Sequence, residues 1–236
     1  MAKKQAKQTQ AEQVGLQDVK LHAIKMHLVG DSPLIVHNFS HKAQGEMLAK
    51  QCKVTWPKEA KDPALQYAGS LYYIDGNGDA VKCPASLELV ASGQVKEFLE
   101  QVAEHNQEMI NQENPRYGFP SVGFKSCAIR GAKSLGLVMA DMKGAFYIPN
   151  EYVEINGVPH MRNDMVRIAK ATSDIRFRAE FTKWETTFDV VYNSAVVTSD
   201  ILHNMFHAGG FACGVGEWRP EKGGSMGMFH VESVTE

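Results

Sequence analysis

The sequence predicts a mixed α+β fold, and three segments carry this prediction. Residues 20–29 alternate apolar and polar side chains, which is typical of a half-buried strand. Residues 121–135 repeat apolar side chains at helical spacing, and the same spacing recurs from 198 to 208. A glycine-rich loop and a closing strand at 226–231 follow that last helix. Helices and strands therefore both contribute to the predicted core.

Composition bounds the class of protein. The chain has 236 residues, 44% hydrophobic and 22% charged, which are ordinary values for a globular protein. No apolar run approaches the roughly 18 residues of a transmembrane helix, and the N-terminus lacks the apolar core of a signal peptide. The four cysteines are far apart in sequence, which favours free thiols in a reducing compartment. We therefore expect a cytoplasmic protein, of a bacterium or of a phage-infected host cell.

The sequence predicts a short N-terminal tail followed by one domain. Residues 1–18 are rich in Gln, Lys and Ala without apolar periodicity, and predict a disordered tail. Residues 19–236 predict a single domain with an insertion, helical or irregular, at about 54–120.

The positive charge is concentrated in one part of the chain. The net charge is −2, yet residues 116–183 hold 11 Lys and Arg against 6 Asp and Glu. This local excess is compatible with a nucleic-acid-binding face, and equally with an ordinary mixed surface.

Helix signals come first along the chain. Ser40 is a suitable N-cap for a helix over 41–53, with Met47 and Leu48 facing inward. A longer helical pattern covers 86–111, and Gly93 is expected to interrupt it. A further helix is expected to begin after Ser121.

Strand signals dominate the second half. Asn156-Gly157, between strand patterns at 151–155 and 158–161, predicts a two-residue β-hairpin. In residues 175–182 apolar side chains alternate with arginine and other polar ones, so we expect one face in the core and the other exposed. A short helix capped by Thr198 or Ser199 is expected to end at Gly209.

The loop after that helix is the most distinctive segment. Glycines let a backbone adopt positive φ or come close to a ligand. Exposed backbone N–H groups beside two cations would suit a phosphate, and a tryptophan face would suit a stacked base. The residues concerned are Gly214, Gly216, Trp218, Arg219, Lys222, Gly223 and Gly224.

A capped helix, a glycine-rich loop and a short terminal strand resemble the second half of a ferredoxin-like β-α-β-β-α-β core of the RRM or RAMP type. The run Gly214-Val-Gly216, then Gly223-Gly224 and Gly227-Met-Phe229, is similar to the glycine-rich signature of the RAMP superfamily, which includes the Cas5, Cas6 and Cas7 proteins of CRISPR systems. The resemblance implies binding of RNA or single-stranded DNA, with the loop near the bound backbone. It is compatible with a Cas7-like protein encoded by a phage.

Further cations are candidates for phosphate contacts. Lys125, Arg130 and Lys133 share one arc of the helix after Ser121. Arg176 and Arg178 point to the same side of a strand, where they would either track phosphates or serve as an ordinary polar face.

Catalytic and metal sites are less well supported. The resemblance to Cas6 implies a general base at His37 or His41 with Lys42 as charge partner, but both histidines also fit ordinary surface positions. His203 and His207 are four residues apart on one helix, without an obvious third ligand, so we predict no metal and no cofactor.

We therefore predict a non-catalytic module that binds RNA or single-stranded DNA, self-associates along the strand and does not bind membranes. Two alternatives remain: a metal-independent endoribonuclease, and a structural or assembly protein whose glycine-rich loop contacts other proteins.

Overall fold

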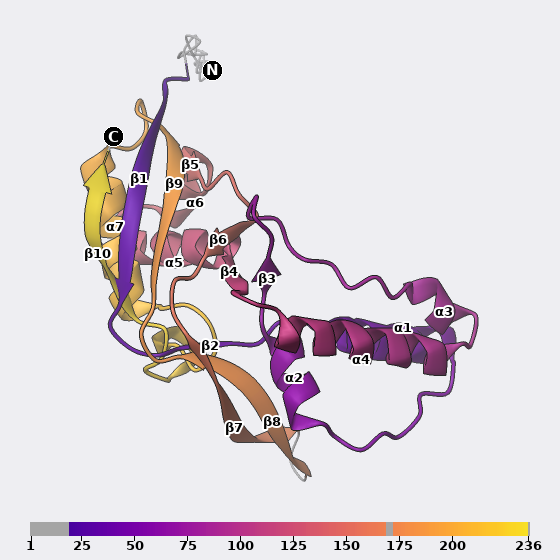
Figure 1. Cartoon of the computed structure of the whole chain (residues 1–236). Coiled ribbons are helices and arrows are strands. Elements are labelled where there is room, and N and C mark those ends of the chain that lie inside the picture. Colours follow the sequence, from indigo (N-terminus) through magenta and orange to yellow (C-terminus); the bar gives the residue numbers. More distant parts are fainter. Residues whose placement is uncertain (1–18, 169–171, 236) are drawn as a thin grey trace, which may run out of the picture.

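The computed structural model describes residues 19–168 and 172–235 (Figure 1); the predicted tail lies outside this range. Its main sheet has four antiparallel strands in the order β10-β1-β9-β5. Alternate residues of β1, Ile24, Met26 and Leu28, are at most 1% exposed, as their spacing predicts. The strands are β1 (Leu21–Gly30), β5 (Phe146–Tyr147), β9 (Glu185–Asn193) and β10 (Phe229–Thr235).

Two helices pack together on one face of this sheet: α5 (Ser121–Ser134) and α7 (Ser199–Ala212) (Figure 1). The short α6 (Met139–Ala145) leads into β5. The core elements therefore follow the chain order β1-α5-β5-β9-α7-β10. This order, with the antiparallel sheet order above, is that of a ferredoxin-like β-α-β-β-α-β unit. The α+β fold class with a ferredoxin-like core is confirmed.

A helical region lies between β1 and α5 in sequence and projects to one side of the sheet (Figure 1). Its helices are α1 (His41–Cys52), α2 (Pro63–Ser70), α3 (Leu87–Ala91) and α4 (Val95–Asn111). Ser40 caps α1 as predicted, and the break between α3 and α4 falls at Gly93, where φ is +87°. Met47 is 50% exposed, so its predicted inward orientation is wrong. The region has its own apolar cluster, made of Ala49, Ala85, Val90, Val95, Phe98, Leu99 and Val102.

Two small sheets complete the fold. One has the order β2-β8-β7 and the other β3-β4-β6. The strands are β2 (Leu34–Val36), β3 (Tyr73–Ile74), β4 (Arg116–Pro120), β6 (Tyr152–Glu154), β7 (Pro159–Ile168) and β8 (Thr172–Phe181). Strands β7 and β8 pair along their whole length and extend away from the main sheet (Figure 1).

The hairpin predicted at Asn156-Gly157 is wrong, because β6 pairs with β4 and β7 pairs with β8. Asn156 instead exchanges two backbone hydrogen bonds with Glu185, of 2.9 and 3.0 Å. A Cβ at Gly157 would lie 2.5 Å from the Lys183 carbonyl oxygen. The glycine at this position therefore allows a close approach to the chain before β9 rather than a tight turn.

The predicted faces of β8 are also partly wrong: Ile175 is 55% exposed, whereas Arg178 is 3% exposed. Helix α7 continues past Gly209 to Ala212, so the predicted end is wrong as well. A Cβ at Gly209 would overlap the Cys127 carbonyl oxygen of α5, so this glycine permits the helix crossing instead of ending the helix. No helix in the described ranges has the length and apolarity that crossing a membrane would require.

Candidate functional site

The glycine-rich loop, residues 213–228, folds back onto β2 and onto itself. The Glu217 N–H donates to the Ile35 carbonyl (2.9 Å), and the Gly227 N–H donates to the Pro33 carbonyl (2.8 Å). Across the base of the loop, the Val215 N–H donates to the Gly227 carbonyl (2.9 Å). A short 3-10 helix, η1 (Pro220–Lys222), forms its outer part. The loop is therefore a packed, hydrogen-bonded structure that joins α7 to β10.

Most of its glycines make room for the protein's own backbone. Gly214, Gly216 and Gly227 have φ between +65° and +76°. A Cβ at Gly216 would lie 2.5 Å from the Ile35 carbonyl oxygen, and one at Gly224 would overlap the Trp218 carbonyl oxygen. At Gly223, where φ is +80°, an added Cβ would meet nothing within 4 Å. Of the predicted ligand-facing glycines, Gly223 alone has open space of this kind.

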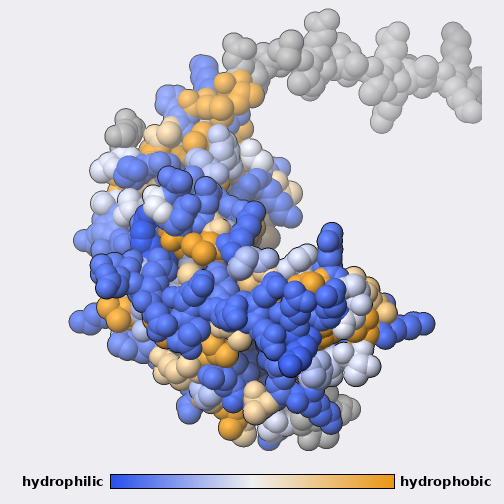
Figure 2. Space-filling model, turned by 45° about the vertical axis from the view of Figure 1, so that its right-hand side comes forward, coloured by the Kyte–Doolittle hydropathy of each residue, from blue (hydrophilic) through white to orange (hydrophobic). Residues whose placement is uncertain are grey.

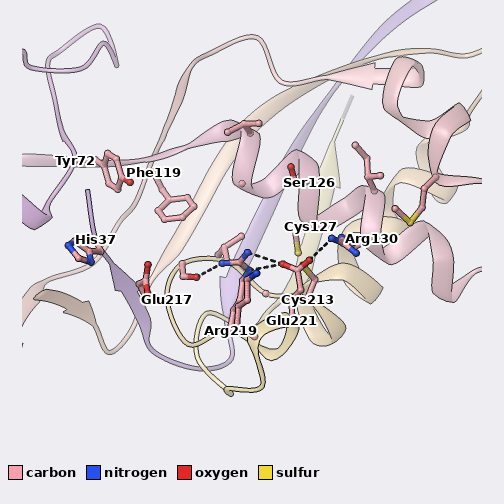
Figure 3. Close-up of a pocket in the computed structure, with 18 of the residues that line it drawn as sticks. His37, Tyr72, Phe119, Ser126, Cys127, Arg130, Cys213, Glu217, Arg219 and Glu221 are labelled. Atoms are coloured by element: carbon pink, nitrogen blue, oxygen red, sulfur yellow. Dashed lines mark hydrogen bonds and ion pairs between the residues drawn. The ribbon is translucent and has the colours of Figure 1, made fainter. Parts of the chain in front are cut away.

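Between this loop and α5 lies a groove with a volume of about 640 Å³ (Figure 3). Loop residues 213–217 line it together with Ser126, Cys127 and Ile129 of α5. The groove has a basic end and an aromatic end, which we describe in turn. Its volume is in the range of small-molecule and cofactor sites.

Four cations line the basic end: Arg130, Lys143, Arg219 and Lys222. Arg130 and Arg219 both contact Glu221, and the side chain of Arg130 is 57% exposed. Arg219 also donates from Nη1 to the Gly216 carbonyl (2.9 Å). The structure thus brings three predicted phosphate contacts together and adds Lys143, which the sequence analysis did not single out.

The aromatic end is formed by His37, Tyr72 and Phe119, with Glu217 beside them (Figure 3). Tyr72 and Phe119 pack edge to face, with ring centroids 5.9 Å apart. Burial raises the pKa of Tyr72 to about 12, so its hydroxyl is neutral and can donate a hydrogen bond. Burial, and then the charge of Arg178, lower the pKa of His37, so its imidazole is neutral at pH 7.

Two buried thiols form part of the floor, Cys127 of α5 and Cys213 at the end of α7. Burial, and then the neighbouring Cys213 thiol, raise the pKa of Cys127. The Cys127 thiol in turn lowers the pKa of Cys213. Their separation in the sequence gives no signal for this pairing, which the crossing of α5 and α7 creates.

Trp218 does not line this groove; it lies at a second hollow of about 510 Å³ that Lys222, Gly223 and Gly224 also line. The residue is 41% exposed, and its φ of +54° is unusual for a residue other than glycine. The guanidinium of Arg162 lies 5.2 Å from the ring centroid. One ring face is thus occupied by a cation–π contact.

Arg178 is buried, so it does not form part of an exposed row of phosphate-binding arginines with Arg176. Its side chain is 3% exposed, and its Nη1 lies 3.5 Å from Asp164 Oδ2, which also accepts a hydrogen bond from Arg162 Nε (3.1 Å). Burial lowers the pKa of Arg178, and its Nε and Nη1 have no hydrogen-bond partner among the described residues. Arg176 remains 39% exposed, with Asp174 at 3.9 Å. The two arginines therefore lie in different environments.

The remaining candidates lie outside the groove. Lys125 is placed over the Phe146 ring, 5.6 Å from its centroid, and Lys133 is exposed further along α5. His41 contacts the Ala85 carbonyl (2.6 Å) and Lys42 pairs with Glu59 (2.7 Å), both in the helical region. His203 and His207 stack with ring centroids 5.8 Å apart. In the part of the chain that the structure describes, no three His, Cys, Asp or Glu side chains form a potential metal site.

No protein-family model and no curated protein matches the sequence. Among solved structures, the crystal structure of Cmr6 from Pyrococcus furiosus matches 91% of this chain and 100% of its own, with 13% identity and a TM-score of 0.33. A TM-score of this size carries no argument about a site or a ligand. The fold class therefore rests on the strand order and helix placement of the chain itself.

Proposed function

We propose that the protein is a non-catalytic module that binds RNA or single-stranded DNA in the groove between the glycine-rich loop and α5. The observation that carries this proposal is the combination, in one groove, of a basic end with an aromatic end. Single-stranded nucleic acid presents phosphates and unstacked bases, which cations and aromatic rings bind without sequence preference. The cations of the basic end outnumber the two carboxylates in the groove, Glu217 and Glu221.

The proposal extends to a RAMP-type protein that assembles along the bound strand, including the phage-borne Cas7-like form. It is supported by the ferredoxin-like core and by the position of the glycine-rich loop between its last helix and last strand. Self-association is supported by the exposed apolar residues Met161, Met165 and Ile175 on the β7–β8 hairpin.

Fluorescence anisotropy with labelled oligouridylate and oligothymidylate of equal length tests the binding. We expect affinity at about 50 mM salt that falls steeply at about 200 mM, because phosphate contacts release counterions. No affinity for either strand at the lower salt concentration would refute the function.

Reversing two charges of the basic end tests whether the nucleic acid binds in this groove. Lys143 and Lys222 are exposed, line the groove and have no ion-pair partner among the described residues. The double variant Lys143→Glu and Lys222→Glu is expected to bind at least about tenfold more weakly and to lower the salt slope by about 2. The matched control reverses the same number of charges at Lys58 and Lys82, exposed residues outside the groove. Equal losses in both double variants would show that binding occurs elsewhere.

A second candidate is the metal-independent endoribonuclease, which one observation favours: a neutral His37 faces the groove. A neutral imidazole can accept the proton of a ribose 2′-hydroxyl. Incubation of a structured RNA in EDTA tests it, with His37→Ala expected to abolish cleavage and His41→Ala to leave it unchanged. Cleavage that survives His37→Ala would exclude this role.

The third candidate, a structural or assembly protein, requires protein contacts instead of nucleic acid. The face shown in Figure 2 is mainly hydrophilic, with apolar side chains in small separate groups. Light scattering with and without an oligonucleotide separates the candidates. Stable oligomers that are indifferent to nucleic acid would favour the assembly protein over the binding module.

A further inference from the structure

One carboxylate holds two arginines at the basic end of the groove (Figure 3). Glu221 Oε2 accepts from Nε and Nη2 of Arg219, at 3.0 and 2.8 Å. Glu221 Oε1 lies 2.8 Å from Nη2 of Arg130. Arg130 is on α5, whereas Arg219 and Glu221 both belong to the glycine-rich loop, at the N-cap of η1 and within it. Both oxygens of the carboxylate are therefore engaged by guanidinium groups.

Two convergent guanidinium groups are also the arrangement that binds a phosphate, which presents several oxygens to such donors. Hydrogen bonding to Arg219 lowers the pKa of Glu221, so the carboxylate is ionised at neutral pH. The position between the arginines is not sealed, because the side chains of Arg130 and Glu221 are 57% and 23% exposed. An anion from solvent can therefore reach it.

We propose that Arg130 and Arg219 form a phosphate site which Glu221 occupies in the free protein and which a phosphate of the bound strand takes over. This inference rests on the proposed function for the identity of the ligand. The exchange replaces one anion by another, so the two arginines contribute less to affinity than two free cations would. Glu221 thus sets the affinity of the groove for nucleic acid.

Removing the charge of Glu221 tests the site. Glu221→Gln is expected to bind a single-stranded oligonucleotide about three- to tenfold more tightly than the unchanged protein, because the arginines then have no competing charge. The control Glu104→Gln makes the same charge change at an exposed residue of α4, outside the groove, and is expected to leave affinity unchanged. Equal or weaker binding by Glu221→Gln than by Glu104→Gln overturns the proposal.

Two further variants separate charge competition from loosening of the loop. Glu221→Asp keeps the charge, so we expect no gain; a gain equal to that of Glu221→Gln would overturn the proposal. Arg130→Ala alone is expected to change affinity less than about twofold, because Glu221 already occupies this arginine. In the Glu221→Gln background the same substitution is expected to remove most of the gain, and additive effects would overturn the proposal.

Pyrophosphate distinguishes a failure of this site from a failure of the proposed function. It is expected to raise the melting temperature of Glu221→Gln more than that of the unchanged protein, and Arg130→Ala is expected to cancel the difference. If pyrophosphate acts in this way but no oligonucleotide binds, the phosphate site stands and the proposed function fails. If neither pyrophosphate nor an oligonucleotide distinguishes Glu221→Gln from Glu104→Gln, the phosphate site itself is refuted.

Discussion

The glycine-rich loop contains positions at which a Cβ atom cannot be accommodated. A Cβ at Gly227, where φ is +66°, would overlap the carbonyl oxygen of Val215, which is backbone and cannot move aside like a flexible side chain. At Gly223, φ is +80° but the added atom would meet open space. Position 227 therefore combines a steric and a conformational requirement for glycine, whereas position 223 has the conformational requirement alone.

This difference predicts graded effects of alanine on the free energy of unfolding. We expect Gly227→Ala to lower it by more than about 3 kcal/mol and Gly223→Ala by about 1 kcal/mol. Gly76→Ala, at an exposed position without positive φ and with nothing within 4 Å, is the control and should stay within about 0.5 kcal/mol. Urea unfolding measures all three. A Gly227→Ala variant as stable as Gly223→Ala would contradict the packing of the loop.

At the scale of elements, local patterns predict the strands and helices better than they predict their partners. The alternation in β1 is sufficient to place Ile24, Met26 and Leu28 in the core, because a strand has a period of two. The predictions at Gly157 and Gly209, a tight turn and a helix end, are wrong because glycine also occurs where two backbone segments come close together. Each glycine allows a close approach to a distant backbone, at Lys183 and Cys127 respectively, and no local pattern distinguishes that from a turn or a helix end.

A histidine links β10 to the segment after β1. Nδ1 of His230 lies 2.6 Å from Asp31 Oδ1, and its Nε2 lies 3.2 Å from Glu232 Oε2. The hydrogen bond to Asp31, and then that to Glu232, raise the pKa of His230 above 6.5. The resulting stabilisation is present in full below the unfolded pKa of about 6.5, and it is lost as pH rises through the higher folded pKa.

We therefore expect His230→Gln to reduce the free energy of unfolding more at about pH 6 than at about pH 9. The difference in the free energy of unfolding between the variant and the unchanged protein reports on His230 alone. This matters because His37 and His105 have lowered pKa values, which make stability change with pH in the opposite direction. His160→Gln, at an exposed histidine without an ion-pair partner among the described residues, is the control. A loss from His230→Gln that is constant with pH would contradict the linkage.

At the scale of the whole molecule, the groove could be predicted only in part. The loop marks Arg219 and Lys222 by their neighbouring glycines, and Arg130 follows from its helix face. Tyr72 and Phe119 are far apart in sequence, and the pairing of β3 with β4 brings them together, through a hydrogen bond of 2.8 Å from the Gly118 N–H to the Tyr72 carbonyl. Such tertiary pairings leave no local periodicity, so the sequence does not predict the aromatic end.

The apolar interior is divided into two clusters, one around the main sheet and a smaller one in the helical region. Phe98 is at the centre of the smaller cluster: it is fully buried, its ring centroid lies 5.3 Å from that of His41, and a Cβ at Gly45 would overlap it. Phe206 is the corresponding residue of the larger cluster, buried beside Phe146 and Phe188 at centroid distances of 5.9 Å. The smaller cluster buries less apolar surface and is expected to open first.

Hydrogen exchange measured by mass spectrometry tests whether the clusters open separately. Phe98→Ala removes a side chain worth about 3–5 kcal/mol of packing, and we expect faster exchange in α1 and α4 while β1, β9 and α7 keep their protection. Phe206→Ala, the matched change in the larger cluster, is expected to accelerate exchange throughout, because β8, whose Ala179 and Phe181 belong to that cluster, contacts α2 of the helical region. If Phe98→Ala accelerates exchange in α7 as much as in α4, the two clusters unfold as one unit, and the helical region is an integral part of the core.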